Sequence, residues 1–226
     1  MRIRQDVLDE IASRFGDAGV TERHVTQSRT LYTNVYGVDE DDPDLQLLFN
    51  VAIQNRARSL SPADYQSLSK KFNPDDFLDC DTHSEAFEHL LYIDDVGPKI
   101  VDEFLRKVVH VFRVKGEWEP ELQVPLDTHV VKALVKTGAI DLEGKDWEDD
   151  LNGNYQRIVN IRPSREVSPR TRIGYYEFQD GFADAASKHD LPKIVFDELW
   201  LEHSRFISNP LLQSKSTLSD LILPEF

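Results

Sequence analysis

The sequence predicts an all-α fold made of two helical lobes around a central groove. Apolar residues recur at helical spacing in most segments, and helix-start signals, such as Ser61 followed by Pro62, precede several of them. Only residues 111–125 read as extended or irregular. No internal repeat or low-complexity tract interrupts the pattern, so we expect one domain of two lobes over residues 1–226.

The expected helices follow one another along the whole chain. Pro43 is expected in the first turn of the second of them, and the clearest apolar stripe runs through Ile100, Phe104 and Val111 in the fifth. The segment from Ser84 opens with a pattern similar to a capping box. The expected helices cover residues 5–15, 43–58, 61–72, 84–93, 98–112, 128–137, 154–161, 175–188 and 192–206.

Composition limits the class of protein. No run of 18 apolar residues and no signal-peptide core is present, so we expect a cytoplasmic protein without a membrane partner. A single cysteine, Cys80, excludes an internal disulfide and a four-cysteine metal or iron–sulfur site within one chain. We expect a monomer.

The formal net charge is −15, with 25 Asp against 16 Glu and 15 Arg against 11 Lys. Short acidic side chains and few lysines favour a halophilic protein, because at molar salt the Debye length is only ~3 Å and self-repulsion is screened. The alternative is a mesophilic protein that is merely acidic. Taken alone, this charge argues against a polyanionic partner.

The segment DDVGP, residues 94–98, predicts a tight turn between two helices. Gly97 permits a positive φ or a close backbone approach, and Pro98 suits the first turn of the next helix. A turn of this kind points backbone N–H groups outward, which makes an uncharged cradle for one phosphate.

Lys99 would lie in the first turn of that next helix, where the helix dipole disfavours a cation and favours the neutral, nucleophilic amine. The alternative is a surface lysine that reaches out to solvent. Asp127, in VPLDTHVVKAL, likewise has two interpretations. It either caps the helix that follows or contributes a carboxylate to chemistry.

Together, these two stretches resemble the helix–hairpin–helix DNA glycosylases, the superfamily of endonuclease III and the oxoguanine glycosylases. The hairpin motif lies at about residues 86–112, the aspartate segment at 124–137, and the resemblance spans roughly 43–137. Gln54 corresponds to a residue near the DNA at the end of an early helix of the family. The residues that match the two motifs are Val96, Gly97, Lys99, Ile100, Val124, Pro125, Asp127 and His129.

The resemblance implies a base-excision-repair enzyme that acts on double-stranded DNA with a damaged base or an abasic site. Such enzymes flip the damaged nucleotide into a pocket. Lys99 would attack C1′, displace the base and form a Schiff base that permits strand cleavage, and Asp127 would stabilise positive charge on the sugar or help to deprotonate the lysine. A candidate base is 8-oxoguanine. Family members without the lysine stop at base removal.

The match has departures. Asp94 and Asp95 stand where the family has proline and glycine, and two carboxylates would repel a phosphate unless a monovalent cation bridges them. No other cofactor and no metal site is expected. The spacing from Lys99 to Asp127 is longer than in compact members, because residues 111–123 add either a plain loop or a wall of the base pocket through Trp118.

A basic run supplies the expected DNA face in this acidic chain. It contains one acid, Glu166, and the alternative is a solvated loop that happens to lack acids. The rival functions are a monofunctional glycosylase and a non-catalytic helix–hairpin–helix DNA-binding protein in which Lys99 contacts phosphate and Asp127 only caps. The arginines of the run are Arg162, Arg165, Arg170 and Arg172.

Overall fold

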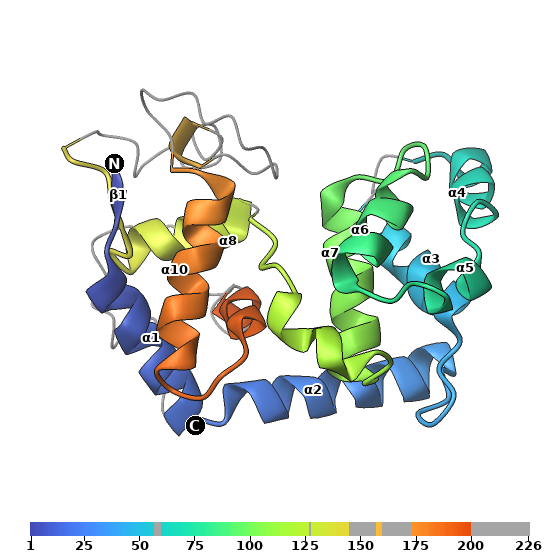
Figure 1. Cartoon of the computed structure of the whole chain (residues 1–226), viewed down its shortest axis with the longest axis horizontal. Coiled ribbons are helices and arrows are strands. Elements are labelled where there is room, and N and C mark those ends of the chain that lie inside the picture. The colour runs from blue at the N-terminus through green and yellow to red at the C-terminus, as the bar shows by residue number, and fades with distance from the viewer. Residues whose placement is uncertain (57–59, 127, 145–156, 160–172, 200–226) are drawn as a thin grey trace. The chain divides into compact units, whose positions relative to one another are not determined.

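The computed structural model describes residues 1–56, 60–126, 128–144, 157–159 and 173–199, and it is mostly helical (Figure 1). This confirms the helical class. The α-helices are α1 Gln5–Asp17, α2 Val20–Leu31, α3 Leu45–Arg56, α4 Pro62–Ser69, α5 Pro74–Leu78, α6 His83–Leu91, α7 Pro98–Leu105, α8 Thr128–Lys136 and α10 Tyr175–Ser187. The other elements are the strands β1 Arg2–Ile3 and β2 Ile140–Asp141, the π-helices η1 Tyr32–Tyr36 and η2 Arg106–Val111, and the 3₁₀-helices η3 Gly116–Glu121 and η4 Lys193–Asp197.

Side chains before the first turn cap several of the helices. Ser61 caps α4 as expected, since its Oγ accepts from the Asp64 N–H at 3.2 Å. The expected start at Pro43 is wrong, because Asp44 Oδ1 accepts from the Leu47 N–H at 3.0 Å and α3 begins only at Leu45. In α6 the cap is Thr82, whose side chain accepts from the Glu85 N–H.

Helices α2, η1 and α5 and the two strands were not expected from the sequence. Helix α2 has no apolar stripe, and its buried residues are Val20 and Thr21 at its start. Strands β1 and β2 pair antiparallel, with Ile3 opposite Ile140. Two-residue strands carry too little pattern to be recognised.

The stretch expected to be extended is partly helical. The helix expected over 98–112 is present as α7 and η2, which follow one another directly, and η3 lies within 111–125. The expected helix 154–161 lies mostly outside the described residues, as does the part of 192–206 beyond residue 199. Its first residues form the 3₁₀-helix η4.

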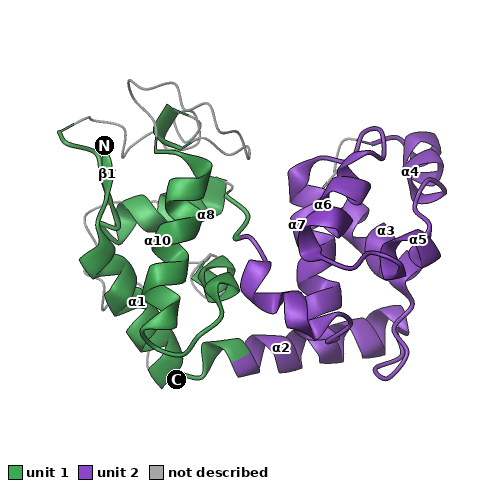
Figure 2. Ribbon diagram, in the orientation of Figure 1, with its two compact units in different colours: residues 1–21, 124–226 green, residues 22–123 purple. Residues whose placement is uncertain are grey.

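The chain divides into two compact units, residues 1–21 with 124–226 (unit 1) and residues 22–123 (unit 2) (Figure 2). Unit 1 packs α1, α8, α10 and η4 around one buried apolar cluster. At its centre Phe182 stacks on Phe196 with ring centroids 4.6 Å apart. Leu8 and Leu134 are fully buried in the same cluster.

Unit 2 is built around an aromatic cluster. The Phe104 ring of α7 contacts Phe49 of α3, Phe72 after α4 and Phe77 of α5 at centroid distances of 5.1–5.5 Å. Trp118 of η3 packs edge-on against Phe77 and is 3 % exposed. The side chain of Trp118 is therefore part of this core, and the interpretation of Trp118 as a wall of a base pocket is wrong.

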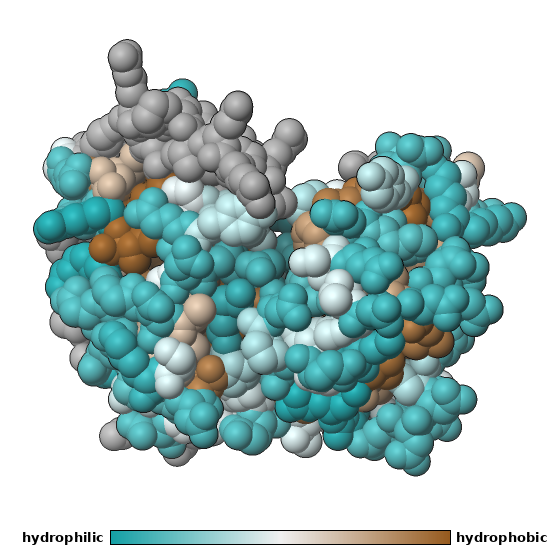
Figure 3. All heavy atoms as spheres, in the orientation of Figure 1, coloured by the Kyte–Doolittle hydropathy of each residue, from teal (hydrophilic) through white to brown (hydrophobic). Residues whose placement is uncertain are grey.

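The surface is hydrophilic, as a chain with 30% charged residues leads one to expect. The face drawn in Figure 3 is predominantly hydrophilic. Among the described residues, no helix combines the length and the apolar character needed to cross a bilayer.

Glu119 gives the stability of unit 2 a defined pH dependence. Burial acts to raise the pKa of Glu119, but the hydrogen bond from His110 Nδ1 at 2.6 Å and the charges of His110 and Arg113 outweigh it and lower the pKa below 4.5. A carboxylate with a depressed pKa stabilises the folded state above its unfolded value, and this contribution is lost as the pH falls. We expect the free energy of unfolding to decline below about pH 4.5 for this reason.

The measurement is urea unfolding at a series of pH values from 3 to 7. Glu119→Gln should lower stability at neutral pH and flatten the acid limb, whereas the exposed neighbour variant Glu117→Gln should keep the wild-type profile. Equal acid limbs for Glu119→Gln and the wild type would contradict the assignment.

Candidate functional site

The turn between α6 and α7 is closed by one backbone hydrogen bond. The Val96 N–H donates to the Ile93 carbonyl at 3.0 Å, which defines a β-turn over residues 93–96. Asp95, its third residue, has φ +70°, as the third position of a type II turn requires. Of the two roles left open for Gly97, a positive φ is excluded, since Gly97 has φ −100°. Asp tolerates the left-handed region because its short polar side chain can bond locally.

Gly97 is not required by the fold itself. Its carbonyl accepts from the Ile100 and Val101 N–H groups as the N-cap of α7. A Cβ built on Gly97 would meet no atom within 4 Å. Among the described residues its N–H has no acceptor. With no side chain at Gly97, the backbone there is uncovered and its N–H can donate to a ligand.

Helix α7 begins at Pro98, as predicted, and Lys99 is its second residue. The Lys99 side chain is partly exposed. Val96 is 7 % exposed and its N–H closes the turn, so Val96 supports the turn and offers a ligand no donor.

The electrostatics of the turn are mixed. Asp94 has an 88 % exposed side chain, and its Oδ2 lies 3.6 Å from Lys71 Nζ. This partner offsets one of the two carboxylates that the sequence places beside the cradle. Among the described residues, no group of three or more His, Cys, Asp or Glu side chains is placed to hold a metal ion.

Tyr92 was missed by sequence reasoning. It caps the C-terminus of α6 directly before the turn, and it is 86 % exposed. The signal was present, because Tyr92 falls outside the helical spacing of the buried residues Ala86 and Leu90.

Gln54 lies near the end of α3, and its side chain is exposed. The next residue, Asn55, donates from Nδ2 to Glu103 Oε1 of α7 at 3.5 Å. Lys99 precedes Glu103 by one helical turn and so lies on the same face of α7. The C-terminal end of α3 and the first turn of α7 are therefore on the same side of unit 2. This places Gln54 and Lys99 on neighbouring elements.

Helix α7 and η2 carry a buried ionic group that the sequence did not reveal. Glu103 Oε2 accepts from Arg106 Nη2 at 3.0 Å, and Lys107 Nζ lies 3.9 Å from Glu103 Oε1. All three residues are 3–6 % exposed. Removing one partner of a buried ion group leaves an uncompensated charge, so the loss of any one of these three charges would destabilise the helix that bears Lys99.

The remaining predicted residues divide between unit 1 and the undescribed segments. Asp127 lies outside the described residues, although α8 begins at Thr128, directly after it, as predicted. His129 is the second residue of α8 and is partly buried. The four arginines of the basic run, residues 162–172, also lie outside the described residues.

Gln179 of α10 holds the segment that leads to α8. Its Oε1 accepts from the Val124 N–H and its Nε2 donates to the Val124 carbonyl, both at 2.9 Å. Gln179 is 3 % exposed and Val124 is fully buried. One amide side chain thus satisfies both backbone groups of a residue three positions before Asp127.

Comparisons of the chain with protein-family models, with curated proteins and with solved structures found no match.

We expect Gln179→Leu to destabilise unit 1 by roughly 2–5 kcal/mol, because the N–H and the carbonyl of Val124 would both be buried without partners. The measurement is the free energy of unfolding in urea. Gln66→Leu, at an exposed helix position, serves as the control and should change stability little. A loss below about 0.5 kcal/mol for Gln179→Leu would mean that the segment rearranges freely.

Proposed function

We propose that the chain is a helix–hairpin–helix DNA glycosylase with abasic-site lyase activity, in which the two units act as lobes around a DNA-binding groove. The observation that carries the proposal is the turn at 93–97, with an unobstructed Gly97 backbone and Lys99 in the first turn of the next helix. A lysine at that position is unfavourable for a helix and useful for an amine nucleophile.

The turn would bind one phosphate through neutral donors. The Gly97 N–H has no acceptor among the described residues, and the N-terminus of α7 adds the partial positive charge of a helix dipole. Such contacts need no lysine or arginine. They suit a chain with a formal net charge of −15.

Lys99 would supply the chemistry. Its neutral amine attacks C1′ of a flipped nucleotide, the base leaves with the bonding electrons and takes up a proton, and the sugar ring opens to a protonated Schiff base. Loss of a C2′ proton then breaks the C3′–O bond, and water releases the enzyme. Asp127, just before α8, would stabilise positive charge on the sugar.

Two exposed side chains of unit 2 would extend the contact. Tyr92 presents a ring directly before the turn, and aromatic rings bind unpaired bases by stacking at about 1–3 kcal/mol per base. Gln54 on α3 offers a donor and an acceptor to the DNA. The basic run of residues 162–172 is proposed as the cationic part of the DNA face.

The test of the proposed chemistry is borohydride trapping on a duplex with one abasic site, in concentrated potassium chloride. Wild type should form a covalent adduct and Lys99→Gln should form none, because glutamine cannot make a Schiff base. Lys70→Gln, an exposed lysine at the end of α4, should trap like the wild type.

Each other result selects a different function. Excision of a damaged base without any adduct would indicate a monofunctional glycosylase. Binding without excision or adduct, weakened by Lys99→Gln, would indicate a non-catalytic DNA-binding protein. No binding by the folded chain would refute the proposal.

The carboxylate of Asp95 gives a separate prediction about affinity. Asp95→Asn removes the charge while keeping a residue that tolerates positive φ, so the fold should be unaffected. A charge near a phosphate contributes about 1 kcal/mol in water, so duplex affinity should rise up to ~5-fold at low salt. The gain should vanish in concentrated salt because of screening.

The measurement is fluorescence anisotropy of a labelled duplex at several salt concentrations. Asp41→Asn, which removes an exposed carboxylate from the loop before α3, is the matched control. Equal gains for the two variants would place the phosphate away from the turn.

A further inference from the structure

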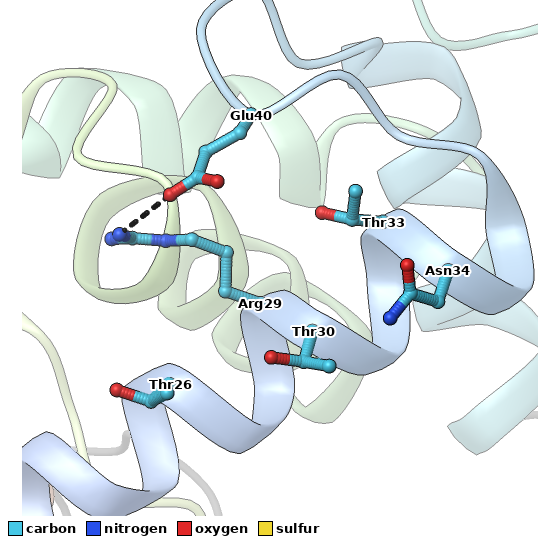
Figure 4. Close-up of a pocket in the computed structure, with 6 residues that line it drawn as sticks. All are labelled: Thr26, Arg29, Thr30, Thr33, Asn34 and Glu40. Carbon is cyan, nitrogen blue, oxygen red and sulfur yellow. Dashed lines mark hydrogen bonds and ion pairs between the residues drawn. The ribbon is translucent and has the colours of Figure 1, made fainter.

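Unit 2 contains a second candidate binding site, a pocket of about 340 Å³ beside α2 and η1 (Figure 4). This volume lies at the lower end of the range for small-molecule sites, about 300–1,000 Å³. The lining residues are Thr26, Arg29, Thr30, Thr33, Asn34 and Glu40. Arg29 also contacts Val111, at the opposite end of the continuous segment 98–111 from Lys99, so this pocket is separate from the turn.

The charged groups of the pocket are already paired with other protein groups. Arg29 donates from Nε and Nη2 to the Val111 carbonyl at 3.1 and 2.6 Å, which satisfies the last carbonyl of η2. Its Nη1 donates to Glu40 Oε1 at 3.0 Å (Figure 4). The guanidinium is thereby fixed in place and its charge is balanced. An anionic or cationic ligand would find no uncompensated opposite charge here.

The neutral lining groups, in contrast, are not used by the fold. Thr26, Thr30 and Asn34 are exposed and make no side-chain hydrogen bond with the described residues, whereas Thr33 Oγ1 is buried without a partner among them. Thr30 is four positions after Thr26, and Thr33 and Asn34 are three and four positions after Thr30, so all four lie along one face of α2 and η1. Thr and Asn are poor helix formers, so helix stability does not explain this choice of residues.

A row of unused hydroxyl and amide groups beside a neutralised ion pair fits one kind of ligand. We propose that this pocket binds a small, uncharged, polyhydroxylated molecule of monosaccharide size. Its hydroxyl groups would exchange hydrogen bonds with Thr26, Thr30 and Asn34, each of which can donate and accept. The fixed Arg29–Glu40 pair would act as a rigid wall that needs little ordering on binding. The π-helix η1 is consistent with a functional role, since such turns are frequent at functional sites.

The experiment is a titration of the full ¹⁵N-labelled chain with D-glucose, followed by amide chemical shifts. We expect saturable shifts confined to residues 26–40 and millimolar affinity. Thr30→Val keeps the shape and removes one hydroxyl, so it should weaken binding roughly 2- to 10-fold, the value of one neutral hydrogen bond. Gln27→Ala, an exposed α2 residue outside the pocket, should bind like the wild type.

Two charged probes complete the test. D-gluconate has a similar carbon chain and a carboxylate, and it should bind more weakly than D-glucose because desolvation of the charge is not compensated. Tighter binding of D-gluconate or of inorganic phosphate would overturn the proposal in favour of an anion site. Shifts that do not saturate, or equal losses for Thr30→Val and Gln27→Ala, would also overturn it.

Discussion

The packing of the Phe104 ring against Phe49, Phe72 and Phe77 is the contact on which unit 2 depends. It brings α3, α5 and α7 to one core, and large-to-small changes in such cores cost about 3–5 kcal/mol. Because α7 and η2 run directly into one another, fixing Phe104 fixes both ends of this segment. One end carries the turn with Lys99, and the other carries the Val111 carbonyl that Arg29 binds. A single apolar core thus positions both candidate sites.

The buried charges of the same segment are not explained by stability. Burying Glu103 with Arg106 and Lys107 incurs desolvation costs that an apolar core of equal volume would avoid. Both ion pairs join residues three or four positions apart on one continuous helical segment. Lys107 also lies over the Tyr32 ring, 5.2 Å from its centroid, so the start of η1 contacts this segment. Asn55 of α3 also donates to Glu103, so the ionic group contacts both neighbouring elements.

Local signals were sufficient for much of the fold and for part of the candidate site. Ser61 and Pro62 at the start of α4, and Pro98 and Lys99 at the start of α7, follow from chemistry within four residues, and the structure has them as predicted. Helix α2 could not be found, because its order depends on contacts such as Arg29 with Val111, 82 residues away. The Gln179–Val124 pair joins residues 55 apart and is equally invisible to periodicity. A positive φ was one of two roles left open for Gly97, whereas the turn needs it at Asp95, a residue type that signals this conformation less strongly than glycine does.

An acidic chain can bind DNA, its proposed partner, if the phosphate contacts are made by uncharged donors such as those of the turn. A cation that neutralises a phosphate releases counterions, and each such contact lowers log affinity by about 0.9 per tenfold rise in salt. A backbone N–H such as that of Gly97 releases none, so its contact persists where salt is concentrated. Lys71 lies near Asp94 and offsets the repulsion between that carboxylate and a phosphate, without itself contacting the DNA. Binding by neutral donors and base stacking would therefore have a shallow salt dependence, and a surface rich in carboxylates would cost such binding little when the Debye length is a few ångströms.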